Sequence, residues 1–309
     1  MRSVKIFAPA TVANVTCGFD ILGFAVHQPG DEVTLKRKDS PGIIIQEIKG
    51  DGGLLPRDIN KNTASVAIKA YLDHLKLDCG IEIFLEKKMP LGSGLGSSAA
   101  SAVAAVFGVN ELIGRPLSPM ELLPFAMQGE FEACGEAHAD NVAPALLGGF
   151  VLIRSYNPLD VVKIDAPKDL FASIVHPQIE IATKDARSIL KKSLLLKDAV
   201  TQWGNVAGLI TGLIKEDYDL ISRSMEDVIV EPVRSMLIPG FDQVKSAALN
   251  AGALGCGISG SGPSIFSLSR SSETATKVAN EMEACFKQLD IICDVFISPV
   301  NQEGPLIIS

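Results

Sequence analysis

Three alternating glycines followed by two serines constrain this chain more than any other segment does. Residues 90–105 read PLGSGLGSSAASAVAA, with glycine at 92, 94 and 96 and serine at 97 and 98. Glycine lets backbone N–H groups turn inward without a side chain in the way, and the start of a helix adds unpaired amides and about half a positive charge. The order predicts a loop that enters a helix at residues 97–113 and holds an anion such as a phosphate.

This loop differs from the common P-loop, which requires a lysine directly before the serine pair. In this chain Ser97 follows Gly96 directly, so the lysine of the P-loop pattern is missing. A second interpretation stays open at this point, because a loop of small residues also lets a helix pack closely against a sheet. The preceding Pro90, the doubled serine and two further glycine-rich segments favour the anion site.

Length and composition predict a two-domain globular protein without a nucleic-acid or membrane partner. The chain has 309 residues, about twice a typical domain, with 47% hydrophobic and 21% charged residues. Its net charge of -8 lacks the basic character of proteins that bind nucleic acid or anionic membranes. No apolar run reaches the ~18 residues of a membrane span, and the first ten residues lack a signal-peptide core. We therefore expect a cytoplasmic protein, whose six scattered cysteines are reduced.

Hydrophobic periodicity predicts strands and helices in both halves of the chain, with Tyr156, Asn157 and Pro158 as the connection between two domains. Strands are expected at residues 4–8 (ending at Pro9), within 32–48 as a pair, at 81–85 and 150–153, near 161, and at 172–175, 264–268 and 293–298. Helices are expected at residues 63–75, 97–113, 119–135, 197–213, 241–250 and 273–289, with a helical run at 184–194. Asn62 occupies the position of a helix N-cap, and Glu130 alone would be assigned to a solvated helix face.

Two further polar segments leave alternatives open. Asn14 and Asp20 lie in a turn-rich stretch, where they either close hydrogen-bonded turns or face a ligand. Residues 255–260 match G-x-G-x-x-G, but a helix is predicted before them and a strand after. A dinucleotide site needs the reverse order, so we reject that site and keep a sheet-corner turn and a ligand contact as alternatives.

The three small-residue segments at residues 9–23, 90–105 and 252–267 together resemble the GHMP kinases, which phosphorylate galactose, homoserine, mevalonate and phosphomevalonate. PLGSGLGSSAA is highly specific, and the similarity extends over essentially the whole chain. It is greatest to the homoserine branch, through PAT.AN..CGFD.LG at the start, HADNVAPALLGGF in the middle, and ATKDARSIL combined with Arg234.

The resemblance implies an α+β, two-domain GHMP kinase fold. The N-terminal domain, residues 1–155, would contain a mixed sheet with a left-handed β-α-β crossover, and the C-terminal domain, residues 156–309, would be ferredoxin-like. A homodimer is expected by analogy with the family.

The resemblance also implies sites for ATP and Mg²⁺. The ATP-binding residues would be Asn62, Pro90, Leu91, Gly92, Ser93, Gly94, Leu95, Gly96, Ser97, Ser98, Ala99 and Ala100. Ser98 and Glu130 would hold Mg²⁺, a hard cation that prefers such oxygen ligands. For Asn62 and Glu130, the family pattern replaces the assignments as a cap and a solvated face.

The acceptor implied is L-homoserine, converted to O-phospho-L-homoserine in threonine biosynthesis. Homoserine is a zwitterion, so its ammonium requires a carboxylate and its carboxylate suits guanidinium groups. The family pattern assigns Asp20 to the ammonium and Arg187 with Arg234 to the carboxylate. Asn14, His138 and Thr183 would complete the pocket.

The catalytic residues implied are Asn141, Asp140 and Ser98. Asp140 matches the aspartate base of mevalonate kinases, whereas homoserine-specific members are described as lacking a well-placed base, with Asn141 near the reacting hydroxyl. Whether Asp140 is a base stays open, and Mg²⁺, loop amides and the helix start are expected to lower the barrier.

The first motif departs from the family pattern P-A-T-S-A-N-L-G-P-G-F-D. Val12, Val15, Thr16 and Cys17 replace Ser, Leu, Gly and Pro, which leaves the local backbone path undetermined.

Two other functions stay open: a kinase for another small alcohol, such as mevalonate, and a ligand-sensing relative without turnover. Arg187 and Arg234 favour a carboxylated substrate but do not exclude mevalonate. Intact Ser98, Glu130 and glycine loop favour a catalyst over a sensor.

Overall fold

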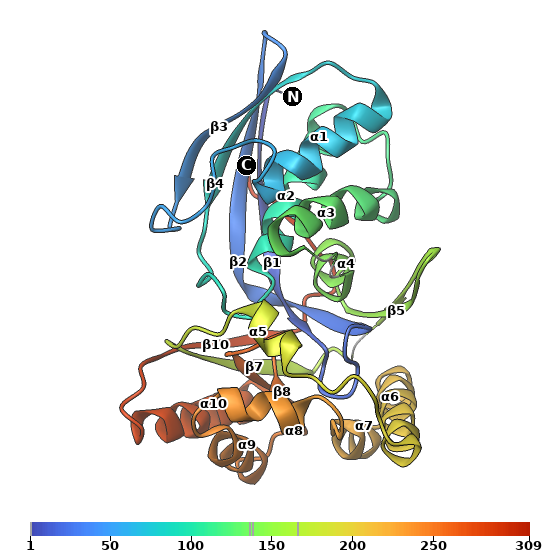
Figure 1. Ribbon diagram of the computed structural model, residues 1–309, viewed down its shortest axis with the longest axis vertical. Helices are drawn as coiled ribbons and strands as arrows, with labels where there is room; N and C mark the ends of the chain where they lie inside the picture. Colours follow the sequence, from blue (N-terminus) through green and yellow to red (C-terminus); the bar gives the residue numbers. More distant parts are fainter. Residues whose placement is uncertain (1, 136, 138, 166) are drawn as a thin grey trace.

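The computed structural model describes residues 2–135, 137, 139–165 and 167–309. Figure 1 shows an upper part, with helices beside a long sheet, and a lower part built on a second sheet. Among the described residues, none of the helices combines the length and apolar character that crossing a bilayer requires.

The upper sheet has seven strands in the described part of the chain, in the order β11-β1-β2-β4-β3, with β5 beside β2 and β6 beside β5. The strands are β1 (Ser3–Ala13), β2 (Leu22–Lys38), β3 (Gly42–Lys49), β4 (Gly80–Glu86), β5 (Phe150–Tyr156), β6 (Leu159–Ile164) and β11 (Leu306–Ile307). Strands β3 and β4 are parallel and are joined through α1 (Thr63–Leu75), while the other pairs are antiparallel. The mixed sheet is therefore confirmed, and the left hand of the β3-α1-β4 crossover stays a prediction.

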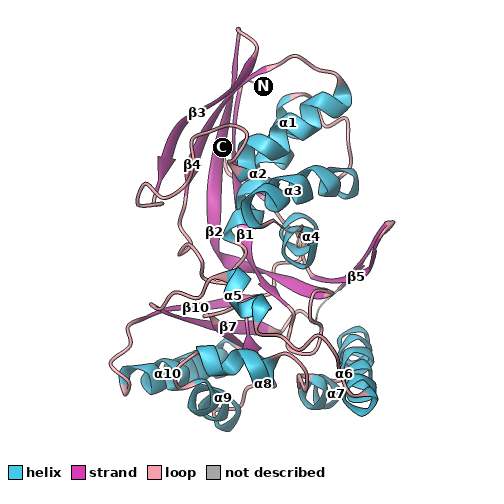
Figure 2. Cartoon of the chain, in the orientation of Figure 1, coloured by secondary structure: helices cyan, strands magenta, loops and turns pink. Residues whose placement is uncertain are grey.

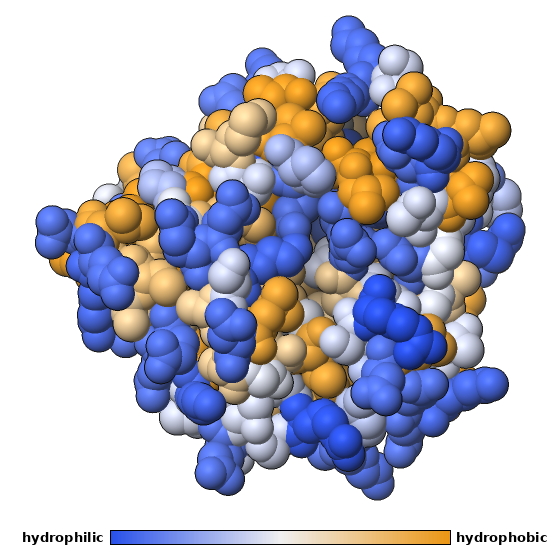
Figure 3. All heavy atoms as spheres, turned by 90° about the horizontal axis from the view of Figure 1, so that it is seen from below, coloured by the Kyte–Doolittle hydropathy of each residue, from blue (hydrophilic) through white to orange (hydrophobic). Residues whose placement is uncertain are grey.

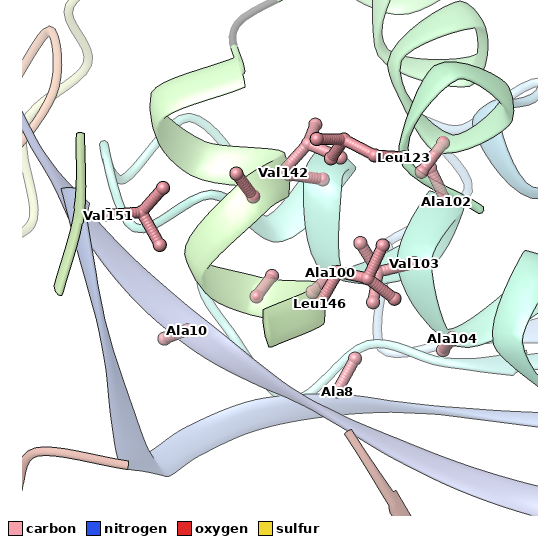
Figure 4. Close-up of a cluster of buried hydrophobic side chains, with 14 of the residues drawn as sticks. Ala8, Ala10, Ala100, Ala102, Val103, Ala104, Leu123, Val142, Leu146 and Val151 are labelled. Carbon is pink, nitrogen blue, oxygen red and sulfur yellow. The ribbon is translucent and has the colours of Figure 1, made fainter. Parts of the chain in front are cut away.

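Helix α2 (Ser97–Leu112) is the centre of the upper core. It lies with α1, α3 (Pro119–Cys134) and α4 (Ala139–Leu147) beside the sheet (Figure 2). Figure 4 shows its Ala100 and Val103 grouped with Leu146 of α4, above Ala8 of β1. Alanine side chains are short, so the alanine-rich segment lets the helix and its neighbours approach closely.

The lower sheet is antiparallel, in the order β10-β7-β9-β8. Its strands are β7 (Phe171–Pro177), β8 (Gly255–Ile258), β9 (Ile265–Ser269) and β10 (Cys293–Pro299). Numbered by chain position, the order is fourth, first, third, second, and α9 (Phe241–Asn250) and α10 (Ser272–Lys287) complete a ferredoxin-like β-α-β-β-α-β unit. The predicted C-terminal fold is confirmed.

The long connection from β7 to β8 carries the remaining helices: α5 (Thr183–Ser188), α6 (Leu196–Lys215), α7 (Tyr218–Ser224), α8 (Glu231–Arg234) and the 3₁₀ turn η1 (Ser235–Leu237). In Figure 1, α5 lies between the two parts, and α6 and α7 lie at the right edge of the lower part.

Three aromatic rings join the two parts. Phe24 of β2 stacks on Phe150 of β5, with ring centroids 4.8 Å apart, and meets the edge of Phe266 of β9 at 5.8 Å. All three side chains are fully buried. The two sheets therefore share one continuous apolar contact.

The expected division at residue 155 lies inside the β5–β6 hairpin, both strands of which belong to the upper sheet. Near the end of the chain, Val300 bridges Val26 and β11 pairs with β1. We propose that the first domain comprises residues 1–165 together with the last ten residues, and that the second comprises residues 166–299.

Three local expectations were wrong. Strand β1 continues past Pro9, because a register shift between Pro9 and Thr11 accommodates a residue that cannot donate to the ladder. Residues 156–158 turn the β5–β6 hairpin instead of linking domains. Strand β8 lies inside the G-x-G-x-x-G segment at residues 255–260, for which the sequence suggested no strand, since pairing with β9 overrides the weak strand propensity of glycine.

Candidate active site

A cleft of about 530 Å³ lies where the two domains meet, and both domains line it. This volume is within the range of small-molecule sites. The lining residues from the first domain that the sequence did not single out are Ala13, Leu55, Pro56, Lys61, Thr63, Leu85, Lys87, Ser101 and Glu132. Gly260 and Ser261 of the second glycine segment line the opposite side.

The glycine-serine loop presents its amides and ties back its carbonyls. The carbonyls of Ser93, Gly94 and Leu95 accept from Ser264 N, Ser259 Oγ and Thr11 N at 3.3, 2.8 and 3.0 Å. In the described part of the chain, no amide from residue 92 to 98 donates to a protein acceptor. Such a row of available N–H groups, ending in the first turn of α2, is suited to a chain of phosphates.

The loop holds this path because glycines permit close contacts. Gly94 has φ +76, and a Cβ there would lie 2.4 Å from Ser259 O and 2.8 Å from Gly262 O. Gly96 has φ +67, and a Cβ there would lie 2.2 Å from Thr11 Oγ1. Each is therefore required by its contacts as well as by its backbone angle.

Beneath the loop lies a buried ion pair that sequence reasoning missed. Lys87 Nζ pairs with Asp31 and donates to Ser97 O and Ser101 Oγ, both at 2.7 Å. Asp31 also accepts from Ser97 Oγ at 2.8 Å and from the backbone amides of residues 88 and 89 at 2.8 and 3.1 Å. Burial lowers the pKa of Lys87, and the charge of Asp31 acts against that shift. The pair joins β2 and the end of β4 to the start of α2, although no local motif links two residues 56 positions apart.

At the other end of the cleft, the acidic and basic residues predicted for the substrate lie together. Arg187 on α5 makes two hydrogen bonds of 3.0 Å to the Asp20 carboxylate. Arg234 on α8 is 4% exposed and donates to Ala186 O and Gly260 O, each at 3.0 Å. The ring of Phe19 lies 5.4 and 5.0 Å from the two guanidinium carbons. The cleft thus offers one carboxylate and two guanidinium groups within one pocket.

Asn14 and Thr183 also line this end of the cleft. Asn14 Nδ2 donates to Gly260 O at 2.8 Å, and its Oδ1 accepts from the Asp20 amide at 3.0 Å. Thr183 Oγ1 lies 3.2 Å from Ser261 Oγ. Asn14 therefore joins the segment at residues 9–23 to the segment at residues 252–267. Since Ser259 of the latter also donates to Gly94, all three segments singled out in the sequence meet at the cleft.

The altered first motif keeps its ligand-facing groups in the cleft. Asn14, Val15 and Thr16 all have positive φ, at 72°, 41° and 59°, so Thr16 adopts the left-handed conformation where the family pattern has glycine. Its side chain lies over Gly257, where a Cβ would be 2.7 Å from Thr16 Cγ2. The backbone path that the sequence left undetermined is thus compatible with threonine, because the facing residue is a glycine.

Asp140 and Asn141, at the start of α4, lie on the cleft wall between the loop and the charged end. Burial raises the pKa of Asp140 to about 7, and the negative charge of Asp20 adds to the rise. Its Oδ1 is buried and has no hydrogen-bond partner among the described residues. Asn141 Oδ1 accepts from Thr11 Oγ1 at 2.8 Å, which fixes its amide.

Ser98 and Glu130 line the cleft beside the start of α2, and Glu130 is 3% exposed. Within the described ranges, no group of three or more His, Cys, Asp and Glu side chains gathers that could hold a metal. A hydroxyl and one carboxylate are oxygen donors of the kind used for Mg²⁺, which takes few protein ligands and completes its shell with water and phosphate oxygens. The donor set therefore fits Mg²⁺ bound together with a phosphate.

Comparison with known proteins decides the family. A model of the GHMP kinases N terminal domain matches residues 62–149, and a model of the GHMP kinases C terminal matches residues 209–288. A homoserine kinase of Chlorobaculum tepidum is 52% identical, over 100% of this chain and 99% of the relative. The chain belongs to the GHMP kinase family.

Solved structures of GHMP kinases agree with the fold. The crystal structure of homoserine kinase from Cytophaga hutchinsonii matches with a TM-score of 0.98 and 61% identity, covering 100% of this chain and 98% of that one. A mevalonate kinase of L. major shares the fold alone, with a TM-score of 0.70 and 18% identity over 96% of each chain. The predicted family and fold are confirmed, and the chain is a kinase.

Most of the predicted site residues line the cleft of this GHMP kinase. They are Asn14, Asp20, Asn62, Leu91, Gly92, Ser93, Gly94, Gly96, Ser97, Ser98, Glu130, Asp140, Asn141, Thr183, Arg187 and Arg234. Pro90, Leu95, Ala99 and Ala100 do not line it, and the last three are buried in the core beneath the loop. His138 lies outside the described residues.

Asn62 is the N-cap of α1 and also lines the cleft, while its contact with a nucleotide stays a prediction. Its Oδ1 accepts from Ala64 N at 3.1 Å as the cap of α1, and its Nδ2 donates to Pro56 O at 3.0 Å, while the residue lines the cleft. The Asn62 side chain thus joins the start of α1 to Pro56, which also lines this part of the cleft.

Replacing Asp31 by asparagine should destabilise the fold by about 3–5 kcal/mol, because it leaves the Lys87 ammonium buried without its counterion. Urea unfolding measures the change. The double substitution Asp31→Asn with Lys87→Met should recover part of the loss. Breaking the solvent-accessible Lys287–Glu283 pair of α10 by Lys287→Met should cost only about 0.3–0.5 kcal/mol. Equal losses in Asp31→Asn and Lys287→Met would contradict the assigned role of the buried pair.

Proposed function

We propose that this GHMP kinase transfers the γ-phosphate of ATP to the hydroxyl of L-homoserine, giving O-phospho-L-homoserine for threonine biosynthesis. One observation carries the proposal. A single cleft contains a row of available loop amides at one end and a carboxylate with two guanidinium groups at the other. The first end suits a triphosphate, and the second suits the two opposite charges of an amino acid. The proposal also fits the cytoplasmic location expected from the sequence.

At the nucleotide end, the amides of residues 92–98 would receive the phosphates, and Leu55, Pro56 and Asn62 would wall the base. The Lys87–Asp31 pair keeps the start of α2 in place, so the amides need little rearrangement when the nucleotide binds. Ser98 and Glu130 would hold Mg²⁺, which neutralises phosphate charge when bound.

At the acceptor end, the substrate would exchange with an ion pair already present. Asp20 would receive the ammonium, while Arg187 and Arg234 would receive the carboxylate, so each charge of the Asp20–Arg187 pair gains a new partner. Arg234 is held by two carbonyls and is ready for a bidentate contact. This binding directs the side-chain hydroxyl toward Asp140, Asn141 and the loop.

We propose Asp140 as the group that accepts the proton of that hydroxyl. A pKa of about 7 is suited to a general base at neutral pH, and its unpartnered Oδ1 is available to the substrate. Asn141, fixed by Thr11, would orient the same hydroxyl. Positioning by the loop and the charged pocket supplies the rest of the catalysis.

A coupled assay of ADP release with homoserine, mevalonate and galactose as acceptors tests the function. The proposal predicts turnover with homoserine alone. Turnover with mevalonate would identify a kinase for another alcohol, and ATP binding without turnover on any acceptor would identify a ligand-sensing relative. Either result would overturn the proposal.

Substituting Arg187 by leucine should raise the KM for homoserine by about 10²-fold and leave the KM for ATP nearly unchanged, because hydrogen bonds to charged groups contribute about 1.5–3 kcal/mol. Steady-state kinetics with each substrate varied in turn measures both constants. Lys184→Leu is the matched control, since Lys184 is an exposed cation on the same helix. Equal rises in both constants for Arg187→Leu would remove Arg187 from the acceptor site.

Activity should rise as the pH rises through about 7, because the ionised form of Asp140 is the base and becomes populated there. Asp140→Asn should lower kcat by about 10²–10⁴-fold and abolish this rise. A pH profile of kcat for both proteins provides the measurement. A variant that keeps both its rate and the profile of the parent would show that transfer proceeds without this base.

A further inference from the structure

The ring of Phe19 lies beside both guanidinium groups of the acceptor end, although Phe19 itself is not among the residues that line the cleft. Its centroid is 5.4 Å from Cζ of Arg187 and 5.0 Å from Cζ of Arg234. Both distances are within the ~6 Å over which an aromatic ring attracts a cation. The two arginines come from different helices, α5 and α8, so a single ring contacts two elements that reach the cleft separately.

The two guanidinium groups lie close enough to repel each other. Figure 3 shows hydrophilic side chains spread over the face of the molecule seen from below, whereas Arg234, from the same lower part, is only 4% exposed. Burial lowers the pKa of Arg234, and the positive charge of Arg187 lowers it further. The carboxylates of Asp20, Asp227 and Asp140 act in the opposite direction on the same pKa. The surroundings of the pocket must therefore offset the repulsion between the two cations.

The hydrogen bonds from Arg187 to Asp20 are the ones that the proposed substrate would disrupt, because its ammonium would take over Asp20. A guanidinium that gives up its counterion in a partly buried pocket needs another source of negative potential. An aromatic ring supplies it, since the ring face is negative while the side chain has no net charge. A second carboxylate in place of the ring would attract the guanidinium groups but would also repel the carboxylate of the substrate.

The turn that contains Phe19 is held on both sides of this residue. Before it, the amide of Gly18 donates to Asn14 O at 2.8 Å. After it, the amide of Asp20 donates to Asn14 Oδ1 at 3.0 Å, and the carbonyl of Asp20 accepts from the Tyr156 hydroxyl at 2.8 Å. The backbone around Phe19 is thus in place before any ligand binds, which lets the ring act on the guanidinium groups without rearrangement.

We propose that Phe19 is a positioning residue, whose ring holds Arg187 and Arg234 side by side for the carboxylate of the acceptor. The inference rests on the proposed function, because it requires an acceptor that carries a carboxylate. Attraction of both guanidinium groups to one ring lowers the cost of their proximity, so both can donate to the same carboxylate. Loss of the ring should weaken acceptor binding and leave the nucleotide end unchanged.

Phe19→Leu should raise the KM for homoserine by about tenfold, the order expected for loss of a cation–π contact in a partly desolvated pocket. The KM for ATP and kcat should stay nearly unchanged, and Phe19→Tyr, which keeps the ring, should keep the KM of the parent. Phe171→Leu is the matched control, because Phe171 is a half-buried ring on β7 that does not line the cleft. Steady-state kinetics with each substrate varied measures these constants. An unchanged KM for homoserine in Phe19→Leu would overturn the proposal.

Fluorinated phenylalanines at position 19 separate the electrostatic attraction of the ring from its packing. Fluorine withdraws electrons from the ring face and adds little volume, so the attraction to a cation falls as fluorine atoms are added. Mono-, tri- and pentafluorinated phenylalanine, incorporated by nonsense suppression, should raise the KM for homoserine stepwise. Circular dichroism melts verify that each protein folds. A KM that is constant along this series would show that the ring acts by packing alone, contrary to the proposal.

An unfolding experiment without acceptor distinguishes failure of this inference from failure of the proposed function. Urea unfolding of Phe19→Leu, Arg187→Leu and the double variant gives the coupling between the two side chains. We expect a coupling of about threefold in the unfolding equilibrium constant. A parent protein that does not phosphorylate homoserine would refute the proposed function, and the unfolding cycle would then decide on Phe19. Strictly additive effects in that cycle would exclude the contact with Arg187 as a positioning interaction.

Discussion

The buried contact between Lys87 and Asp31 determines the form of the glycine-serine end of the cleft, where we propose that phosphates bind. It joins β2, the end of β4 and the first turn of α2, three segments that are distant in sequence. A helix start that receives anions repels cations, so a lysine beneath it must be compensated. Asp31 supplies that compensation, and the lysine in turn donates to the Ser97 carbonyl, which holds the first turn of α2 in place.

The cleft requires both domains because neither contains a complete set of ligand groups. The first domain provides the amides, Asp20 and Asp140, whereas Arg187 and Arg234 come from the β7–β8 connection of the second. Gly260 links the two sides by accepting from both Asn14 and Arg234. The proposed binding of a phosphate donor and a charged acceptor in one place would therefore be a property of the domain interface.

The sequence predicted the parts of the site that depend on local chemistry. Alternating glycines before a serine pair identified the loop. The periodicity of hydrophobic residues predicted most of the helices and strands. The family pattern added the long-range set, since Arg187 and Arg234 are single arginines without local context. Neither kind of reasoning found Lys87 with Asp31, because a buried pair 56 residues apart is visible only once β2 and β4 are adjacent. Strand β8 was missed for a similar reason, as its partner β9 decides its conformation.

The aromatic contact of Phe24, Phe150 and Phe266 has a consequence for how ligands enter. Rings buried across the boundary of the two sheets resist separation, because pulling them apart would expose their apolar faces to water. The short helix α5, which carries Thr183 and Arg187 and is mostly solvent-exposed, is held to the first domain by the hydrogen bonds from Arg187 to Asp20. A ligand that competes for Asp20 or Arg187 would therefore loosen α5, while the aromatic contact keeps the two sheets in place.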